Sequence, residues 1–347
     1  MKFKSYTLSE LATIKYGKNQ SKVNCTSSEY PIYGTGGFMG YASKPLYDKP
    51  SVLIGRKGTI GRVKYVEHPF WTVDTLFYTE VNEQIVLPHF LYYAMSLIDL
   101  NKYNEGTTIP SLRTETLNRL ELLIPNIEEQ KKILSILESI DKKIEINSAI
   151  NHNLEQQAFA LFDHLFPNIS DGLCTIGDYI TPKRGRNLLS KDAVPGTVPV
   201  VAGGLEPSTY HNTANTLAPV LTISASGANA GFVNLWHTPV WSSDSSFIDS
   251  SMTEDVYFWF VMLKKRQREI FDAQTGSAQP HIYPQHIAAM TIRSWDKALM
   301  SDFASQVTPL FALIGANKDE NDRLASVRDA LLPKLMSGEI DVSEVEL

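Results

Sequence analysis

The sequence has few cysteines and no grouped metal ligands. Cys25 and Cys174 are the only two cysteines among 347 residues, and neither belongs to a Cys-x-x-Cys pair or a Cys/His cluster. They do not occupy equivalent positions of the internal repeat described below, so we expect free, buried thiols rather than a disulfide or a metal site. The eight histidines show no His-x-x-x-His spacing, which argues against metal chemistry.

Long apolar segments are also absent. No uninterrupted apolar run reaches the ~18 residues that a membrane-spanning helix requires. The N-terminal sequence MKFKSYTLSE lacks the apolar core of a signal peptide. We therefore expect a cytoplasmic location.

Nucleotide-binding and catalytic motifs are missing as well. The stretch GTGGFMG (34–40) lacks the Gly-x-Gly-x-x-Gly spacing, and no Gly-Lys-Ser or Gly-Lys-Thr follows a glycine-rich loop, so we expect a turn there. No Gly-x-Ser-x-Gly elbow is present, although scattered Ser, His and Asp residues leave a catalytic triad open. The sequence predicts no active site.

Charge is distributed unevenly along the chain, whose net charge is −6. Residues 1–126 hold 14 Lys and Arg against 11 Asp and Glu, and residues 168–295 hold 9 against 10. The acidity lies in residues 127–167, with 4 against 7, and 296–347, with 5 against 10. Basic residues cluster at Lys15/Lys18, Arg56/Lys57/Arg62/Lys64 and Lys183/Arg184/Arg186. Each cluster is either a patch that attracts anions or an ordinary solvated face.

The chain is a tandem duplication. TLSELATIKYGKN (7–19) aligns with TIGDYITPKRGRN (175–187) at an offset of 168. PFWTVDTLF (69–77) aligns with PVWSSDSSF (239–247), and EGTTIPSLR (105–113) with TGSAQPHIY (275–283), both at an offset of 170. Each half therefore consists of a globular segment followed by a long helix. The predicted boundaries are 1–126, 127–166, 167–295 and 296–347.

The two long segments carry matched apolar seams with a spacing of 3.5 residues, which a second helix must cover. One seam is Ile133, Leu137, Ile140, Ile144, Asn147, Asn151, Leu154, Ala158, Leu161 and Leu165. The other is Phe303, Val307, Leu310, Ile314, Asn317, Asn321, Leu324, Arg328, Leu331 and Leu335. We predict an antiparallel coiled coil, because the second globular segment begins where the first helix ends.

Four asparagines in mid-seam predict the register. Facing positions of an antiparallel pair sum to a constant, and a sum of 468 sets Asn147 opposite Asn321 and Asn151 opposite Asn317. Only Ile140 opposite Arg328 and Ala158 opposite Leu310 are then poor layers. Buried asparagines cost stability but fix register and partner. The alternative is a seam that is merely interrupted and solvated at this point.

The globular segments read as mixed α/β. Short β-branched and aromatic runs predict strands at 51–55, 62–66, 75–80, 219–224 and 238–243, and helices are expected at 90–100 and 256–271. The fold class is thus α+β, with two pseudo-twofold-related α/β segments joined by two long antiparallel helices. Trp71 with Asp74 and Trp241 with Asp244 recur at one spacing, and the two tryptophans are expected in the core. The loops at 56–62 and 224–231 are either plain hairpin turns or sites for phosphates and base edges.

At the level of whole motifs, the chain resembles the specificity (S) subunit of type I restriction-modification systems. The motifs that carry this resemblance are NIEEQKKIL (126–134), LESIDKKIEINSAINHNLEQQAFALFDHLF (137–166), LASVRDALLPKLMSGEIDV (324–342) and the duplication itself. The globular segments resemble its target recognition domains in outline, and TGSAQPHIYPQ (275–285) departs from EGTTIPSLRTE (105–115). This departure is where a different base specificity is expected.

The resemblance implies a protein without an active site that reads bipartite double-stranded DNA. Its partners would be two adenine-N6 methyltransferase (M) subunits and restriction (R) subunits, with S-adenosylmethionine and ATP bound by those partners and no cofactor on this chain. The absence of an (Asn/Asp)-Pro-Pro-(Tyr/Phe) motif and of a Walker A motif agrees with this division. The alternative is a tandem scaffold that binds proteins or glycans. A self-sufficient methyltransferase is excluded unless the purified protein binds S-adenosylmethionine.

Equivalent loops of the two halves are the predicted DNA contacts, because amides and hydroxyls read base edges while Lys and Arg bind phosphates or guanine. In the first half these residues are Lys15, Lys18, Asn19, Arg56, Lys57, Arg62, Thr107, Thr108, Ser111 and Arg113. In the second half they are Lys183, Arg186, Asn187, Ser226, Asn229, Gln274, Ser277, Gln279 and His281.

Overall fold

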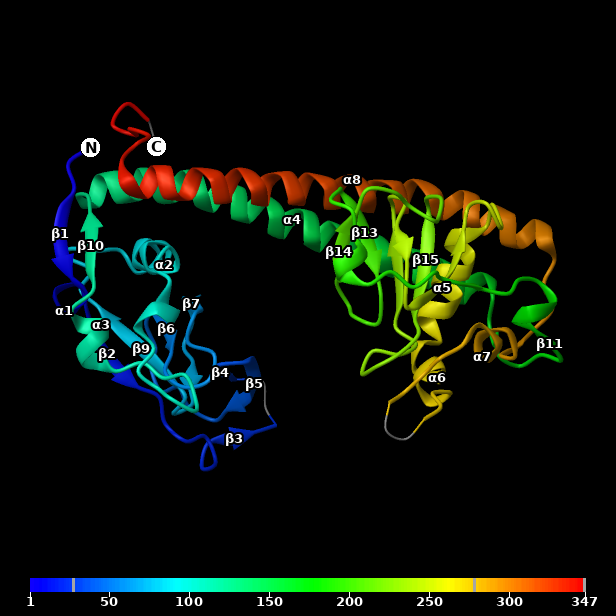
Figure 1. The fold of residues 1–347 in the computed structure, drawn as a ribbon, viewed down its shortest axis with the longest axis horizontal. Coiled ribbons are helices and arrows are strands. Elements are labelled where there is room, and N and C mark those ends of the chain that lie inside the picture. The colour runs from blue at the N-terminus through cyan, green and yellow to red at the C-terminus, as the bar shows by residue number, and fades with distance from the viewer. Residues whose placement is uncertain (27–28, 277–278, 346–347) are drawn as a thin grey trace. The chain divides into compact units, whose positions relative to one another are not determined.

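The computed structural model describes residues 1–26, 29–276 and 279–345 (Figure 1). The chain divides into two compact units, one made of residues 1–144 and 323–347 and the other of residues 145–322. Each unit contains one globular segment together with a stretch of each long helix, α4 (Ile127–Leu165) and α8 (Lys297–Ser337). The helix α4 agrees with the predicted segment 127–166 to within one residue, and α8 begins one residue after position 296 but ends at Ser337, before the predicted boundary at 347.

The first unit contains three sheets. Their strand orders are β2-β9-β6-β7, β3-β5-β4-β8 and the antiparallel pair β1-β10. The elements are β1 (Lys4–Thr7), α1 (Leu8–Leu11), β2 (Ala12–Tyr16), β3 (Asn24–Cys25), β4 (Tyr30–Gly34), β5 (Gly37–Ala42), β6 (Ser51–Gly55), β7 (Val63–Val66), β8 (Trp71–Thr72), β9 (Leu76–Val81), α2 (Pro88–Ser96), η1 (Leu100–Tyr103), α3 (Thr114–Asn118) and β10 (Glu121–Ile124).

Among the described residues the second unit repeats this topology, except that its β14-β13-β17 sheet has no counterpart of the edge strand β3. Its sheets have the orders β12-β18-β15-β16, β14-β13-β17 and β11-β19. The elements are β11 (Cys174–Thr175), η2 (Ile176–Asp178), β12 (Lys183–Arg184), η3 (Ser190–Asp192), β13 (Val198–Val201), β14 (Thr209–His211), β15 (Val220–Ser224), β16 (Val233–Trp236), β17 (Trp241–Ser242), β18 (Ser245–Asp249), α5 (Val256–Lys265), α6 (Gln267–Asp272), α7 (Pro284–Ala288) and β19 (Thr291–Ile292).

The core of the first unit joins its sheet to both long helices. Phe77 of β9 and Phe90 of α2 are fully buried and share one cluster with Ile133 and Leu137 of α4 and Leu335 of α8. The seam residues of the helices are therefore also the residues that anchor the globular segment. Burying apolar side chains of this size contributes roughly 1.5–3 kcal/mol each.

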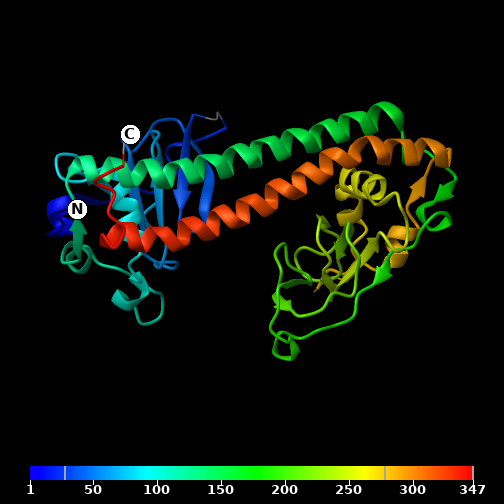
Figure 2. The ribbon, with the colours of Figure 1, turned by 90° about the horizontal axis from the view of Figure 1, so that it is seen from above.

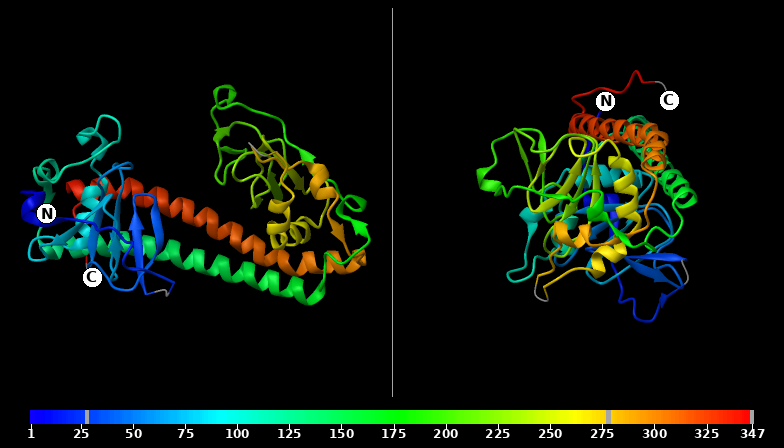
Figure 3. Two further views of the ribbon diagram at one scale, coloured as in Figure 1. Left: turned by 90° about the horizontal axis from the view of Figure 1, so that it is seen from below. Right: turned by 90° about the vertical axis from the view of Figure 1, so that its right-hand side faces the viewer.

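The second unit is built around an aromatic cluster. Phe162 of α4 and Phe166, the residue after its end, pack against Phe258 of α5 and Phe303 of α8, with ring centroids 4.9–6.2 Å apart. Phe162 lies outside the predicted seam, because α4 buries a face wider than a two-helix contact requires. The sheets of this unit lie on one side of the helix pair, and α5 lies between the sheets and the helices (Figure 3).

Within each unit α4 and α8 run antiparallel (Figure 2). In the second unit Asn147 Nδ2 donates to Asn321 Oδ1 at 2.9 Å, and Asn317 Nδ2 donates to Asn151 Oδ1 at 2.8 Å. These are the two pairs expected from the constant sum of 468. Asn147 is almost fully buried, so its amide needs this partner.

In the first unit Arg328, which was expected to oppose Ile140 in a poor layer, forms an ion pair with Asp141. Arg328 Nη1 donates to Asp141 Oδ1 at 2.8 Å, and Tyr93 Oη donates to Asp141 Oδ2 at 2.6 Å. The two carboxylates of Asp141 and Asp329 raise the pKa of the Arg328 guanidinium against the opposing effect of burial. The arginine thus faces Asp141 and does not stack on Ile140.

Several predicted elements differ in detail. The run at 256–271 is two helices, α5 and α6, separated at Arg266. The buried Arg266 guanidinium donates to Glu269 and to the carbonyl of Thr291, which holds the break in place. The predicted strand at 238–243 is reduced to the two residues of β17. The side chains of Cys25 and Cys174 are half-buried, so the expectation that both thiols are buried is wrong.

One helix, α8, has the length and apolar composition of a membrane span among the residues that the structure describes. The expectation from uninterrupted runs did not anticipate this, because polar residues interrupt the helix. Its apolar side chains Phe303, Val307 and Phe311 are buried in the core of the second unit, as in the core helix of a folded domain.

Candidate nucleic-acid interface

Two loops of the first unit are joined by backbone hydrogen bonds. The amide of Gly58 donates to the carbonyl of Pro110 at 2.9 Å, and the amide of Leu112 donates to the carbonyl of Arg56 at 2.9 Å. Gly58 has a φ of 84°, a left-handed conformation that favours glycine. The two loops, 56–62 and 105–113, therefore form one surface.

The second unit joins the equivalent loops in the same way. Gly227 donates to the carbonyl of Pro280 at 3.1 Å, and Ile282 donates to the carbonyl of Ala225 at 2.9 Å. Gly227 has a φ of 80°. The repetition, at offsets of 169 and 170 residues, shows that the loops belong to the duplicated scaffold and are more than plain hairpin turns.

A third segment approaches the paired loops in both units. The amides of Gly17 and Gly185 donate to the carbonyls of Leu76 and Ser245, at 3.0 and 2.8 Å. A Cβ at Gly17 would lie 2.0 Å from the carbonyl oxygen of Val73, and one at Gly185 would lie 2.5 Å from that of Ser242. These glycines allow the backbone to pass close beside the strand turn.

The repeated tryptophans hold this third segment. Trp71 Nε1 donates to the carbonyl of Lys18, and Trp241 Nε1 donates to the carbonyl of Arg186, both at 2.8 Å. Trp71 is buried, as expected for a core residue, whereas Trp241 is partly exposed. Each indole fixes the backbone beneath a basic residue whose side chain is exposed.

Arg56 is oriented by an aromatic ring and a carbonyl. Its guanidinium lies 5.0 Å from the ring centroid of Tyr16, and its Nη1 donates to the backbone carbonyl of Asp74 at 2.8 Å. Tyr16 is 50% exposed, so an exposed ring and a cation lie side by side. Arg113 is also exposed, and its Nε lies 3.1 Å from a carboxylate oxygen of Glu105.

Lys15 lies apart from this group. Side chains alternate along β2, and Tyr16 packs against Phe77 on one face while Lys15 Nζ lies 3.5 Å from Glu80 on the other. Lys15, one of the predicted DNA contacts, is therefore directed toward Glu80 and away from the Tyr16 face.

The other predicted residues of the first unit are accessible at the loops. Ser111 and Arg62 differ from the rest: Ser111 is half-buried in a backbone bridge with Lys57, and Arg62 lines a cavity of ≈ 270 Å³ with Tyr33 and Lys64. Burial lowers the pKa of Lys64, whose Nζ lies 4.0 Å from the Tyr33 ring centroid. Exposed residues are Lys18, Asn19, Lys57, Thr107 and Thr108.

The predicted DNA-contact residues of the second unit differ in exposure and in their hydrogen bonds. Gln274 is structural, since its Nε2 donates to the carbonyl of Ala230 at 2.7 Å. The His281 ring stacks on the exposed Tyr283 ring with centroids 5.9 Å apart. Asn229 is half-buried, and Ser277 lies outside the described residues. Lys183, Arg186, Asn187 and Gln279 are exposed.

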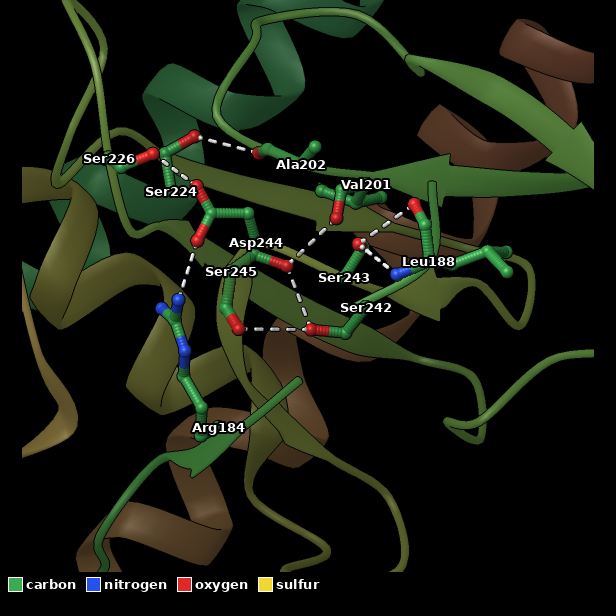
Figure 4. A network of polar contacts seen from close by, with 10 residues as sticks. All are labelled: Arg184, Leu188, Val201, Ala202, Ser224, Ser226, Ser242, Ser243, Asp244 and Ser245. Atoms are coloured by element: carbon green, nitrogen blue, oxygen red, sulfur yellow. Dashed lines mark hydrogen bonds and ion pairs between the residues drawn. The ribbon is translucent and has the colours of Figure 1, made fainter. Parts of the chain in front are cut away.

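Sequence reasoning missed the polar network around Asp244. Figure 4 shows the Asp244 carboxylate between Ser226, whose hydroxyl donates to Oδ2, and Arg184, whose Nη2 donates to Oδ1 at 2.5 Å. Beside it the hydroxyls of Ser242 and Ser245 lie 2.8 Å apart, and the Ser243 hydroxyl accepts from the amide of Leu188. The signal available in the sequence was Arg184 in a basic cluster and Asp244 in the repeated Trp/Asp pair.

Comparisons with known proteins agree with this architecture. Residues 1–156 match the family described as "Type I restriction modification DNA specificity domain". The type I restriction enzyme MjaIX specificity subunit of Methanocaldococcus jannaschii is 26% identical, covering 86% of this chain and 80% of that protein. The HindI specificity subunit of Haemophilus influenzae is 36% identical over 115 residues, covering 30% of this chain and 25% of that protein.

A solved structure shows the same fold. The crystal structure of the type I restriction-modification S subunit from M. genitalium has a TM-score of 0.62 and 21% sequence identity, covering 96% of both chains. The predicted fold class is confirmed. These relatives are specificity subunits of type I restriction enzymes, and the matched family is a DNA specificity domain. Over most of its length the chain is therefore similar to specificity subunits of type I restriction-modification systems, and its first 156 residues match the DNA specificity domain.

Proposed function

We propose that the chain reads two half-sites in duplex DNA, one through each globular segment, around a spacer of fixed length and no preferred sequence. The first recognition segment is residues 1–126 and the second is residues 167–295. The observation that carries this proposal is the repeated loop pairing, in which Gly58 donates to Pro110 and Gly227 to Pro280. Two copies of one surface suit two separate sites.

Side-chain chemistry divides the contacts into two kinds. The exposed Lys18, Lys57, Lys183 and Arg186 suit DNA phosphates, because a cation there neutralises charge whatever the base. Thr107, Thr108, Asn187 and Gln279 carry hydroxyls and amides that suit base edges. Arg113 suits the two acceptors of guanine if Glu105 releases it.

The partners follow from the two-site arrangement. One M subunit at each half-site would methylate adenine at N6, and R subunits would join for cleavage. The chain itself supplies binding and position. A proposed stoichiometry of two M subunits to one chain follows from one recognition segment per methyltransferase.

Methylation mapping tests whether each globular segment recognises one half of a bipartite DNA site. The chain, expressed with its M subunits in a host without other adenine methylation, should yield one bipartite motif. Arg113→Ala should change only one half of that motif and Gln279→Ala only the other. Lys131→Ala, an exposed residue of α4 whose Nζ lies 2.8 Å from Glu128, is the control and should leave both halves unchanged.

The contrary outcomes are equally specific. A continuous motif, or a change in both halves from one substitution, would contradict the assignment of one segment to each half. The relatives do not favour a protein- or glycan-binding scaffold. Such a scaffold would also lack the steep fall of duplex affinity with salt that phosphate contacts produce.

A further inference from the structure

Asp244 sets the direction of a hydrogen bond at the second recognition surface. A carboxylate that pairs with a guanidinium only accepts hydrogen bonds, so the Ser226 hydroxyl must donate its single proton to Asp244 Oδ2. Arg184 holds the other oxygen from a distance of 2.5 Å. The Asp244 side chain is only 32% exposed, so water competes weakly for these bonds.

The fixed proton gives Ser226 a defined chemistry. A free serine donates or accepts, whereas a serine whose proton is committed presents only lone pairs. In the major groove the hydrogen-bond donors are the N6 amino group of adenine and the N4 amino group of cytosine. Ser226 lies in the loop bridged to His281, where the proposed function places base contacts.

We infer that the Asp244 carboxylate makes Ser226 an obligate acceptor, so that the second half-site has an amino-bearing base, adenine or cytosine, at the position Ser226 faces. Asp244 is a positioning residue and Ser226 the reading residue. The inference rests on the proposed function, because it requires this loop to enter the DNA groove.

The first segment supplies a matched control. At the equivalent aspartate, Asp74, it is the backbone carbonyl that accepts from Arg56 Nη1. Lys57 stands in the position of Ser226, since Lys57 bridges Ser111 as Ser226 bridges His281. The substitution Asp74→Asn therefore leaves the direction of this backbone hydrogen bond unchanged.

Asp244→Asn should reverse the direction of the hydrogen bond between Ser226 and residue 244. Arg184 only donates, so the Asn oxygen must face it and the Asn NH₂ group must face Ser226. Ser226 then accepts from that NH₂ group and turns its own proton outward. The preferred base becomes one with a keto oxygen, guanine or thymine.

The experiment is selection from a randomised duplex library with the complete complex, compared with methylation mapping. We expect Asp244→Asn to shift one position of the second half-site from adenine or cytosine to guanine or thymine, with about tenfold discrimination, a typical single-base effect. Ser226→Ala should make the same position degenerate, and Asp74→Asn should leave the motif unchanged.

An Asp244→Asn complex that melts like the wild type and keeps the wild-type motif overturns the inference. Retention of the base preference in Ser226→Ala does so independently, even if Asp244→Asn fails to fold. Failure of the wild-type complex to enrich any bipartite motif would instead contradict the proposed function, so the two failures are distinguishable.

Discussion

The two recognition segments hold their loops with the same backbone hydrogen bonds but furnish them with different side chains. In the first unit Arg56 stacks on Tyr16 and donates to a backbone carbonyl. In the second unit Arg184 and Ser226 share the carboxylate of Asp244. Backbone geometry has been retained through the duplication while side-chain chemistry has diverged. A scaffold of this kind changes what it reads without changing how it folds.

The largest expected effect comes from removing a glycine that both units share. Gly17→Ala and Gly185→Ala each force a Cβ against a carbonyl oxygen, at 2.0 and 2.5 Å. We expect each to destabilise its own unit by about 3 kcal/mol or more, as measured by urea unfolding with hydrogen exchange resolved by segment. Gly36→Ala, which meets nothing within 4 Å, is the control. Equal protection of both units in Gly17→Ala would show that the close approach is dispensable.

Polar layers distinguish the helix pair in the two units. Asn147→Leu removes the amide that donates to Asn321 and should destabilise the second unit by roughly 1–3 kcal/mol. Asp141→Leu removes the acceptor of Arg328 Nη1 and of the Tyr93 hydroxyl and should have a similar effect on the first unit. Gln157→Ala, whose amide makes a local bond to Asn153, should change little. A gain in stability from Asn147→Leu would mean that the asparagine pair serves register alone.

Acid should weaken the second unit through His237. Burial first, and then the nearby Lys318 charge, lower the pKa of His237 from 6.5 to about 4. The unfolded chain therefore binds the proton more readily than the folded chain, and stability falls as the pH drops from about 6.5 towards 4. We expect a loss of about 1–2 kcal/mol between pH 7 and pH 5.

The variant His237→Phe should flatten that pH profile. The Nε2 atom of His237 is buried and has no hydrogen-bond partner within the described part of the chain, so a phenyl ring sacrifices no bond there. Gly315 leaves room for the ring, since a Cβ at Gly315 would lie 2.8 Å from the imidazole. Equal pH dependence of wild type and His237→Phe in urea unfolding would assign the acid sensitivity to other groups.

The smallest expected difference concerns the two indoles. Trp71→Phe removes a buried donor to the carbonyl of Lys18 and should cost about 1 kcal/mol. Trp241→Phe removes the equivalent bond to Arg186 where water can replace it, and should cost a few tenths. Thermal unfolding of both variants measures the difference. A larger loss from Trp241→Phe would reverse the assignment of Trp71 as the more important anchor.

Periodic features of the fold were predictable from the sequence, and contacts between distant positions were not. The seam spacing predicted α4 and α8, and the constant sum anticipated the contact of Asn147 with Asn321. Arg184 and Asp244 are 60 residues apart, and no spacing rule links them. The break at Arg266 was missed because it depends on a bond to the distant Thr291 carbonyl.

The site was predicted as a set of loops but not as an arrangement of groups. The alignment of the halves singled out the loops 56–62 and 105–113, and the structure joins these two loops by backbone hydrogen bonds. It could not show that Lys15 faces Glu80 or that Gln274 is engaged by Ala230. Side-chain direction on a short strand depends on where the strand begins, which pattern reading leaves uncertain by one residue or more.

The paired strands β1 and β10 bring the entrance and the exit of the first globular segment together, with Thr7 opposite Glu121. The strands β11 and β19 do the same in the second unit, with Thr175 opposite Thr291. In each unit, therefore, the first and last strands of the globular segment are paired, so the segment begins and ends at one place. Recombination between genes at the positions of these strand pairs would exchange a whole globular segment. A new DNA specificity would then arise in a single genetic event instead of by stepwise mutation.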